Sequence, residues 1–143
     1  FYLETRFRAN QVASPHCLFI GLFTRDSIVA DGAVTGIDHM GVGCLETLNI
    51  VGSVGDGGGA SDTSTSDTGS DLAINTSVTV ACEYSPSSDT FKTYVDGDLK
   101  ATVTGASVFL PSGECCLGIA TRAGASSTAT AFEIDYIYLT MDR

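Results

Sequence analysis

Tryptophan is absent from this chain of 143 residues, and basic residues are few. Only 7 Lys and Arg stand against 17 Asp and Glu, which gives a formal net charge of −10. No cluster of basic residues would follow a phosphate backbone or an anionic lipid surface. No apolar run approaches the roughly 20 residues that span a bilayer. We therefore predict no nucleic-acid partner and no insertion into a membrane.

Helical periodicity is missing as well, since no window of about 11 residues keeps its apolar side chains on one helical face. Charged residues make up only 17% of the chain, and clusters of Gly, Ser, Asp and Pro separate short apolar runs. These runs predict strands at 1–9, 17–24, 39–52, 77–85, 90–96, 98–104, 115–123 and 131–141. The predicted fold class is all-β, an antiparallel β-sandwich.

The five cysteines match neither a disulfide framework nor a zinc site, and an odd count leaves at least one thiol without a partner in the chain. Cys17 and Cys82 lie inside apolar runs, HCLFIGLF and VTVACEY, where a thiol behaves as a small buried hydrophobe. Reduced core thiols favour assembly in a cytoplasm over secretion.

The length is that of a single domain, residues 1–143. Strand-like alternation begins at Phe1, which we interpret as the edge of a longer polypeptide. Residues 55–71, GDGGGASDTSTSDTGSD, contain no apolar side chain larger than Ala. Because this segment buries too little to offset its ordering entropy, we predict a flexible acidic Gly/Ser/Thr loop.

A hairpin is predicted at Asp96-Gly97, where two alternating runs meet in the stretch TFKTYVDGDLKAT. Both central residues of a type I′ turn need positive φ, which Asp tolerates and Gly accepts freely. A two-residue loop would place Tyr94 opposite Leu99. This acidic turn is therefore interpreted as a corner of the fold, with no binding role of its own.

The order of these segments resembles a known family. SVTVACEYSPSSDTFKTYVDGDLKATVTG, followed by FLPSGECCLGIATRAGASSTATAFEIDYIYL, is similar to the back half of the concanavalin A-like (LamG-like) jelly-roll sandwich. The opening FYLETRFRA and CLFIGLFTRD are similar to its early strands. The resemblance implies a jelly roll, in a family of lectins, glycosidases, adhesion modules and lectin-like domains of bacteriophage capsids and tails.

The catalytic branch of this family carries Glu-x-Asp-x-Glu on one strand face, with the two Glu as nucleophile and acid/base. Residues two apart share a strand face, so such a triplet lines a sugar cleft with carboxylates. Here Glu133 and Asp135 match the first two acids, but Ile137 stands in the place of the second Glu. His16 and His39 are far apart, and neither neighbours a convincing nucleophile. We therefore predict no catalytic residues and no enzymatic activity.

Sugar binding without catalysis needs an aromatic platform or a loop ordered by calcium. The candidates for glycan binding are the tyrosines on strand-like runs: Tyr84, Tyr94, Tyr136 and Tyr138. The candidates for a metal site are the carboxylates of the acidic loop: Asp56, Asp62, Asp67 and Asp71. Core packing and a solvated loop explain these residues more simply, so we predict no cofactor and keep Ca²⁺ as the alternative.

Two functions stay open. The first is a non-enzymatic virion structural protein, a decoration or attachment module on a bacteriophage capsid or tail. It would assemble in the host cytoplasm as a homo-oligomer, with capsid or tail proteins as partners and host-surface glycans as a further ligand. The second is a secreted, lectin-like carbohydrate-binding module, with or without calcium. The first reading depends mainly on the family resemblance.

Overall fold

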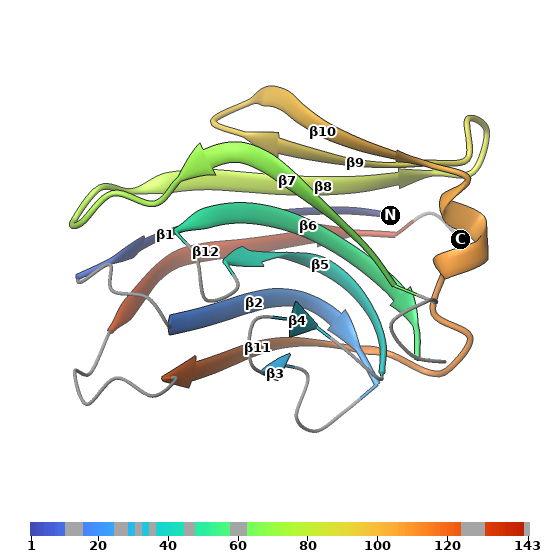
Figure 1. The fold of residues 1–143 in the computed structure, drawn as a ribbon, viewed down its shortest axis with the longest axis horizontal. Coiled ribbons are helices and arrows are strands. Elements are labelled where there is room, and N and C mark those ends of the chain that lie inside the picture. Colours follow the sequence, from blue (N-terminus) through green and yellow to red (C-terminus); the bar gives the residue numbers. More distant parts are fainter. Residues whose placement is uncertain are drawn as a thin grey trace.

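Two five-stranded antiparallel sheets are stacked face to face in the computed structural model (Figure 1). It describes residues 1–10, 16–24, 29–30, 33–34, 37–44, 48–57, 63–123 and 131–141. Sheet A has the order β10-β9-β8-β1-β12, and sheet B has the order β11-β2-β5-β6-β7. The predicted all-β fold class, an antiparallel jelly-roll sandwich, is confirmed.

The strands of sheet A are β1 (Tyr2–Ala9), β8 (Val78–Ser85), β9 (Thr90–Val95), β10 (Asp98–Thr104) and β12 (Phe132–Thr140). Those of sheet B are β2 (His16–Phe23), β5 (Asp38–Cys44), β6 (Asn49–Asp56), β7 (Thr63–Asp71) and β11 (Cys116–Ala123). A short hairpin, β3 (Val29–Ala30) with β4 (Ala33–Val34), and the 3-10 helix η2 (Ala106–Phe109) complete the described elements. Within this described part, no helix has the length and apolarity that crossing a membrane requires.

Alternation along the strands decides which side chains form the core. In β1, Leu3 and Phe7 are buried between the sheets, while Glu4 and Arg6 point to the opposite face of sheet A. The core residues that lose all exposure include Leu18, Ile20, Val42, Ile50, Val80 and Phe91, which come from both sheets. Each side chain of this kind contributes about 1.5–3 kcal/mol on burial. The polar residues are thereby left on the outer face of sheet A.

Strand β2 is buried on both faces, as its continuous apolar sequence predicts. Leu18 and Ile20 face the core between the sheets. Cys17 and Phe19 face the other way and form a second buried cluster with Val51 of β6. The outer side of sheet B is therefore buried at β2 and β6. The outer face of sheet A, in contrast, is open to solvent.

The predicted hairpin is present between β9 and β10. Asp96 and Gly97 have φ values of 51° and 86°, as a type I′ turn requires. Tyr94 pairs with Leu99, and Val95 pairs with Asp98, in the predicted register. The Asp96 side chain also accepts a hydrogen bond from the Thr79 amide at 2.9 Å, which ties the turn to β8.

Two assignments made from the sequence are wrong. The run 39–52 is split between β5 and β6, and the predicted loop at 55–71 contains β7, Thr63–Asp71. Strand β7 pairs with β6. Its Ser and Thr hydroxyl groups form hydrogen bonds to β6, which stabilise the strand although it has few apolar side chains to bury. Thr68 donates to the Ile50 carbonyl at 2.7 Å, and Thr65 lies 3.0 Å from the Ser53 hydroxyl. A polar segment can thus be ordered as a strand beside an established neighbour.

Candidate functional site

Tyrosines and glutamates from four neighbouring strands gather on the outer face of sheet A. Across β1, Tyr2 is opposite Glu83, and Glu4 is opposite both Ala81 of β8 and Tyr138 of β12. Tyr94 of β9 lies opposite Ala81 on its other side. We call this surface the tyrosine–glutamate face and define it by six residues: Tyr2, Glu4, Glu83, Tyr94, Tyr136 and Tyr138.

A β-bulge in β12 decides which of its side chains join this face. Arg6 pairs with Tyr136 and Phe7 pairs with Ile134, so Asp135 is the extra residue of the bulge. As a result Tyr136 points outward, and Ile137 packs against the core. The bulge therefore separates Ile137 from the strand face of Asp135, although the two residues are two positions apart.

Glu4 is held by two tyrosine hydroxyls, one on each carboxylate oxygen. Tyr2 donates to Oε2 at 2.6 Å, and Tyr136 donates to Oε1 at 2.7 Å. These two hydrogen bonds hold the pKa of Glu4 below its ordinary value. Burial, followed by the bond to Glu4, raises the pKa of Tyr2. Glu4 is therefore an ionised acceptor at neutral pH, and Tyr2 is a neutral donor.

Glu83 forms a second carboxylate centre on the same face. Its Oε1 accepts from the Tyr94 hydroxyl at 2.8 Å and from the Lys92 ammonium at 3.1 Å. Burial works to raise the pKa of Glu83, but the bonds from Tyr94 and Lys92 outweigh it and lower the pKa. Burial and the bond to Glu83 raise the pKa of Tyr94 to about 12. Oε2 of Glu83 has no hydrogen-bond donor among the described residues and remains open to a ligand.

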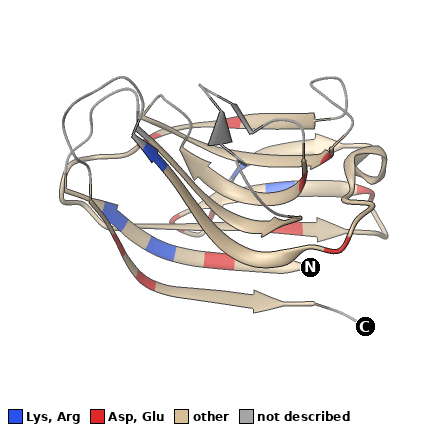
Figure 2. Cartoon of the chain, turned by 90° about the horizontal axis from the view of Figure 1, so that it is seen from below, with Lys and Arg blue, Asp and Glu red and all other residues tan. Residues whose placement is uncertain are grey.

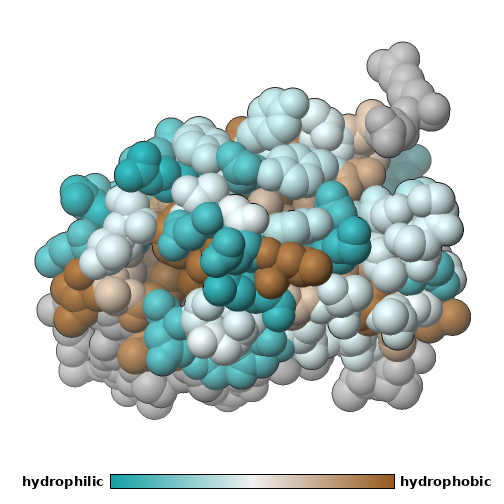
Figure 3. Space-filling view, turned by 90° about the horizontal axis from the view of Figure 1, so that it is seen from above, coloured by the Kyte–Doolittle hydropathy of each residue, from teal (hydrophilic) through white to brown (hydrophobic). Residues whose placement is uncertain are grey.

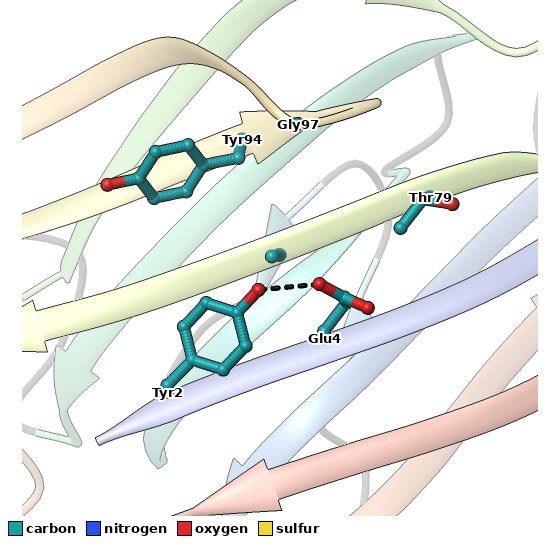
Figure 4. Close-up of a pocket in the computed structure, with 6 residues that line it drawn as sticks. Tyr2, Glu4, Thr79, Tyr94 and Gly97 are labelled. Atoms are coloured by element: carbon teal, nitrogen blue, oxygen red, sulfur yellow. Dashed lines mark hydrogen bonds between the residues drawn. The ribbon is translucent and has the colours of Figure 1, made fainter.

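A shallow pocket of about 200 Å³ extends from Tyr2 and Glu4 of β1 across β8 to Tyr94 of β9. Figure 4 shows Tyr2 and Glu4 on β1, joined by their hydrogen bond, with Tyr94, Thr79 and Gly97 around the same space. A second, more open hollow of about 500 Å³ begins on the other side of Tyr2 and extends to Glu83 and Pro86. Tyr2 thus lines both depressions.

Basic residues on sheet A are all engaged by carboxylates of the protein. Arg6 lies 3.4 Å from Asp135, and Arg8 lies 2.6 Å from Glu133. Figure 2 shows the basic segments of β1 running beside the acidic segments of β12. Lys92 is paired with Glu83, and Lys100 of β10 lies 3.3 Å from Asp98. Glu133 and Asp135, the two acids that matched the glycosidase motif, therefore serve as partners of arginines.

Exposed apolar residues outside this face are spread over several elements of the described part of the chain. Leu99 and Val108, at 52% and 67% exposure, belong to β10 and η2. Figure 3 looks onto the edge of the sandwich formed by β7 and β10, where hydrophilic and weakly polar residues surround small apolar patches. Patches of this size are normal for a protein surface.

The predicted glycan-binding tyrosines divide into two groups. Tyr94, Tyr136 and Tyr138 belong to the tyrosine–glutamate face, and Tyr138 packs edge-on to Tyr2 with ring centroids 6.3 Å apart. Tyr84 lies apart from them, because its ring packs against the core and its hydroxyl donates to Asp89 at 3.4 Å. The structure brings three of the four candidates together.

The predicted metal ligands are not gathered into a site. Asp56 ends β6, while Asp67 and Asp71 are spread along β7. Asp67 accepts hydrogen bonds from Asn49 and from the Gly69 amide, at 3.0 and 2.7 Å. Asp62 lies outside the described residues. Among the residues described, no three His, Cys, Asp or Glu side chains are placed to hold a metal ion.

The chain adopts a concanavalin A-like jelly-roll sandwich, and the outer face of its sheet A is polar and rich in tyrosine. A known structure with the same fold is a kappa-carrageenase from Pseudoalteromonas carrageenovora, in complex with an oligotetrasaccharide of kappa-carrageenan. The TM-score is 0.52 at 15% sequence identity, over 95% of this chain and 62% of the carrageenase. No family model and no curated protein matches the sequence.

This neighbour contradicts our prediction that the chain is not an enzyme, because a carrageenase has the fold that this chain adopts. The prediction considered only an acidic triplet within a single strand, at Glu133, Asp135 and Ile137. A sheet face, however, combines acids from different strands, as it does here with Glu4 of β1 and Glu83 of β8. The expected setting on a bacteriophage particle gains no support from the comparison, and the compartment stays a prediction.

Sequence reasoning missed Tyr2, Glu4 and Glu83 as members of the site. The alternation of β1 does place Tyr2 and Glu4 on its outer face, and that signal was available. Their partners are far away in sequence, since Glu4 bonds Tyr136 across 132 positions. Gly97 was predicted only as a turn residue of the hairpin, yet it also lines the pocket.

Proposed function

We propose that this chain is a carbohydrate-binding domain and that the tyrosine–glutamate face binds an oligosaccharide. The pocket lined by Tyr2, Glu4 and Tyr94 carries the proposal, because it combines aromatic surface with fixed hydrogen-bonding groups on an open sheet face. Small-molecule sites typically have this combination. The likeness to a carrageenase solved with an oligosaccharide supports the same class of ligand.

The chemistry of a sugar fits these groups. Sugar hydroxyls donate to ionised carboxylates, and Glu4 and Glu83 are kept ionised by their tyrosine partners. The apolar C–H faces of a sugar ring pack on aromatic rings, for which Tyr138 offers 54% exposure. The depressions on either side of Tyr2 would take adjacent units of one chain.

Binding is tested first on a glycan array and then by calorimetry with the best ligand. Tyr138→Ala removes an exposed ring and is expected to weaken binding about tenfold, or about 1.4 kcal/mol. Val108→Ala truncates an apolar residue of 67% exposure outside the face and serves as the control. Absence of any glycan signal, or equal losses in both variants, would refute the proposed site.

Hydrolysis of the bound chain is the second candidate function, favoured by the fold shared with a carrageenase. Glu4 and Glu83 are diagonal neighbours on adjacent strands, so their backbones lie about 7–8 Å apart. Two carboxyl groups on one side of a sugar chain are the groups that most glycosidases use. The tyrosine bonds lower both pKa values and oppose a role as general acid, so a ligand would have to displace one hydroxyl.

Release of new reducing ends from each array ligand measures this activity. Hydrolysis at the face predicts that Glu4→Gln and Glu83→Gln each abolish release. Glu114→Gln, an exposed carboxylate before β11, is expected to leave it unchanged.

A further inference from the structure

The two edges of the sandwich are closed to different degrees. At one edge, β10 of sheet A lies against β7 of sheet B, and η2 packs against β7 and β9. The strand orders place β12 and β11 at the opposite edge. Ile119 of β11 faces the interior there, because it pairs with the core residue Ile20, and Leu117 lies two positions away on the same strand face. Both Leu117 and Ile119 are nevertheless exposed, so the interior is accessible to solvent at this edge.

Strand β12 is the edge strand of sheet A on this side, and β1 is its only strand partner among the described residues. Figure 2 shows β12 as the outermost strand, ending near the C-terminus. Its first half contains Glu133, Asp135 and the β-bulge, features that typically protect a sheet edge from pairing. Residues 136–140, YIYLT, contain no charge, no Pro and no Gly, and most of them favour strands. We call this segment the uncharged half of β12.

The other edge strands are better protected against pairing with a further strand. Strand β10 contains Asp98 and Lys100, and β7 contains Asp67 and Asp71. Strand β11 contains Arg122 and is interrupted by a glycine, which weakens a strand. An unpaired edge without such features is a template for another strand. The uncharged half of β12 is therefore the edge segment that best fits an added strand.

The uncharged half of β12 is complementary to a second copy of itself. In antiparallel pairing about a two-fold axis at Tyr138, Tyr136 is opposite the partner's Thr140. Ile137 is then opposite the partner's Leu139. Tyr136 and Tyr138 are exposed on the outer face, whereas Ile137 and Leu139 pack against the core. This register therefore joins outward residues to outward residues and apolar residues to apolar residues.

We propose that this chain forms a two-fold dimer in which the uncharged halves of β12 pair, so that the two five-stranded sheets A become one continuous sheet. The core-facing side chains of the partner strand cover the interior beside Ile119. Glu133 and Asp135 lie outside the paired segment, so the register brings no carboxylates face to face. The two tyrosine–glutamate faces form one surface, with Tyr138 of each copy at the axis. The pairing needs no ligand and does not depend on the carbohydrate-binding function proposed above.

Sedimentation equilibrium without any glycan measures the association. Pairing of a short segment is a small contact beside the roughly 1,600 Å² of a stable interface, so we expect a reversible dimer with a Kd of about 10–100 μM. The measurement is made at about 0.15 M salt, which screens the repulsion between two chains of net charge −10. A chain that stays monomeric up to about 1 mM would overturn the inference. Species larger than a dimer would also overturn it, because a two-fold contact closes on itself.

Tyr138→Lys tests whether β12 makes the contact. It places two like charges opposite each other at the axis and is expected to weaken the dimer by about tenfold or more. Leu99→Lys is the matched control, because Leu99 is exposed to a similar extent, 52% against 54%, on the opposite edge strand of sheet A. It changes the net charge equally and is expected to leave the Kd unchanged. Equal effects of the two variants, or no effect of Tyr138→Lys, would contradict pairing through β12.

Engineered cysteines test the register, in a background that carries Cys115→Ser and Cys116→Ser. Directly opposite residues have Cα atoms about 4.5–5.5 Å apart, within the range of a disulfide. Tyr138→Cys is therefore expected to give a linked dimer with oxidised glutathione. Thr140→Cys alone is expected not to link, whereas a mixture of Tyr136→Cys and Thr140→Cys is expected to do so. Thr140→Cys that links to itself as fast as Tyr138→Cys would refute the axis at Tyr138.

Discussion

Two buried threonines illustrate how much a single hydroxyl depends on its partner. Thr5 and Thr93 are both fully buried between the sheets. Thr5 donates to the Tyr136 carbonyl at 2.9 Å, next to the bulge that turns Tyr136 outward. The Thr93 hydroxyl has no hydrogen-bond partner among the described residues and is packed against Gly52. The same side chain is therefore stabilising at one position and costly at the other.

Replacement of each by the isosteric valine tests this difference. Thr93→Val is expected to raise the free energy of unfolding by about 1 kcal/mol, because it removes a buried unsatisfied hydroxyl. Thr5→Val is expected to lower it by about 1 kcal/mol, because it removes a buried hydrogen bond. Urea denaturation of the two variants measures both changes, and effects of equal sign would contradict the hydrogen-bond assignment.

The carboxylate of Glu4 makes a pH-dependent contribution to stability. Its pKa in the fold lies below the ordinary value of 4.5, so the stabilisation is complete above that pH and is lost as the pH falls through the lowered pKa. Tyr136→Phe removes one of the two donors and is expected to raise the pKa of Glu4 toward 4.5. Titration of the Glu4 carboxyl carbon by NMR measures the change.

The control for that titration is Tyr138→Phe, which keeps the ring on the same face but removes a hydroxyl that does not bond Glu4. Its Glu4 titration is expected to match that of the unmodified protein. A Glu4 that titrates at 4.5 or above in the unmodified protein would contradict the two tyrosine bonds.

At the scale of the element, the hairpin between β9 and β10 depends on its backbone conformation. Gly97 has φ +86°, and a Cβ built there meets no atom within 4 Å. Gly97→Ala is therefore expected to cost about 1–2 kcal/mol of unfolding free energy through strain alone. Gly97→Asn is the matched variant, with a smaller loss expected because Asn tolerates positive φ. Equal losses in urea denaturation would point to side-chain crowding.

The same hairpin shows what local sequence determines. Asp96-Gly97 fixed its turn type and cross-strand register, because both follow from residues next to one another in the chain. Strand β7 did not follow from its own residues, since its Ser and Thr side chains are ordered by bonds to β6. The bulge at Asp135 could not be predicted from the residues of β12 either, because it is defined by the pairing of β12 with β1.

At the scale of the whole molecule, the candidate site exists only once the sheet is assembled. Strands β1 and β8 lie side by side, although Glu4 and Glu83 are far apart in sequence. The pattern of strand-like runs predicted Tyr84, Tyr94, Tyr136 and Tyr138 as candidates, and all of them except Tyr84 belong to the face. It did not contain the strand order, so it could not reveal that Tyr2 and two glutamates join them.

The five cysteines report on the packing of the whole sandwich. Cys44 and Cys82 are buried in the main core, and Cys17 is buried in the second cluster on the outer side of sheet B. Cys115 and Cys116 lie near the surface at the start of β11. Burial raises the pKa of Cys44 to about 11, which further suppresses its reactive thiolate.

A thiol reagent added to the native protein at neutral pH is expected to label the exposed Cys116 first and Cys115, whose pKa is raised by burial, more slowly. The other three cysteines are expected to react only after denaturation. Because Cys17 belongs to a separate cluster, mild urea that loosens the outer side of sheet B should expose it before Cys44 and Cys82. Mass spectrometry of labelled peptides along a urea series measures this order. Simultaneous labelling of all three would mean that both clusters unfold as one cooperative unit.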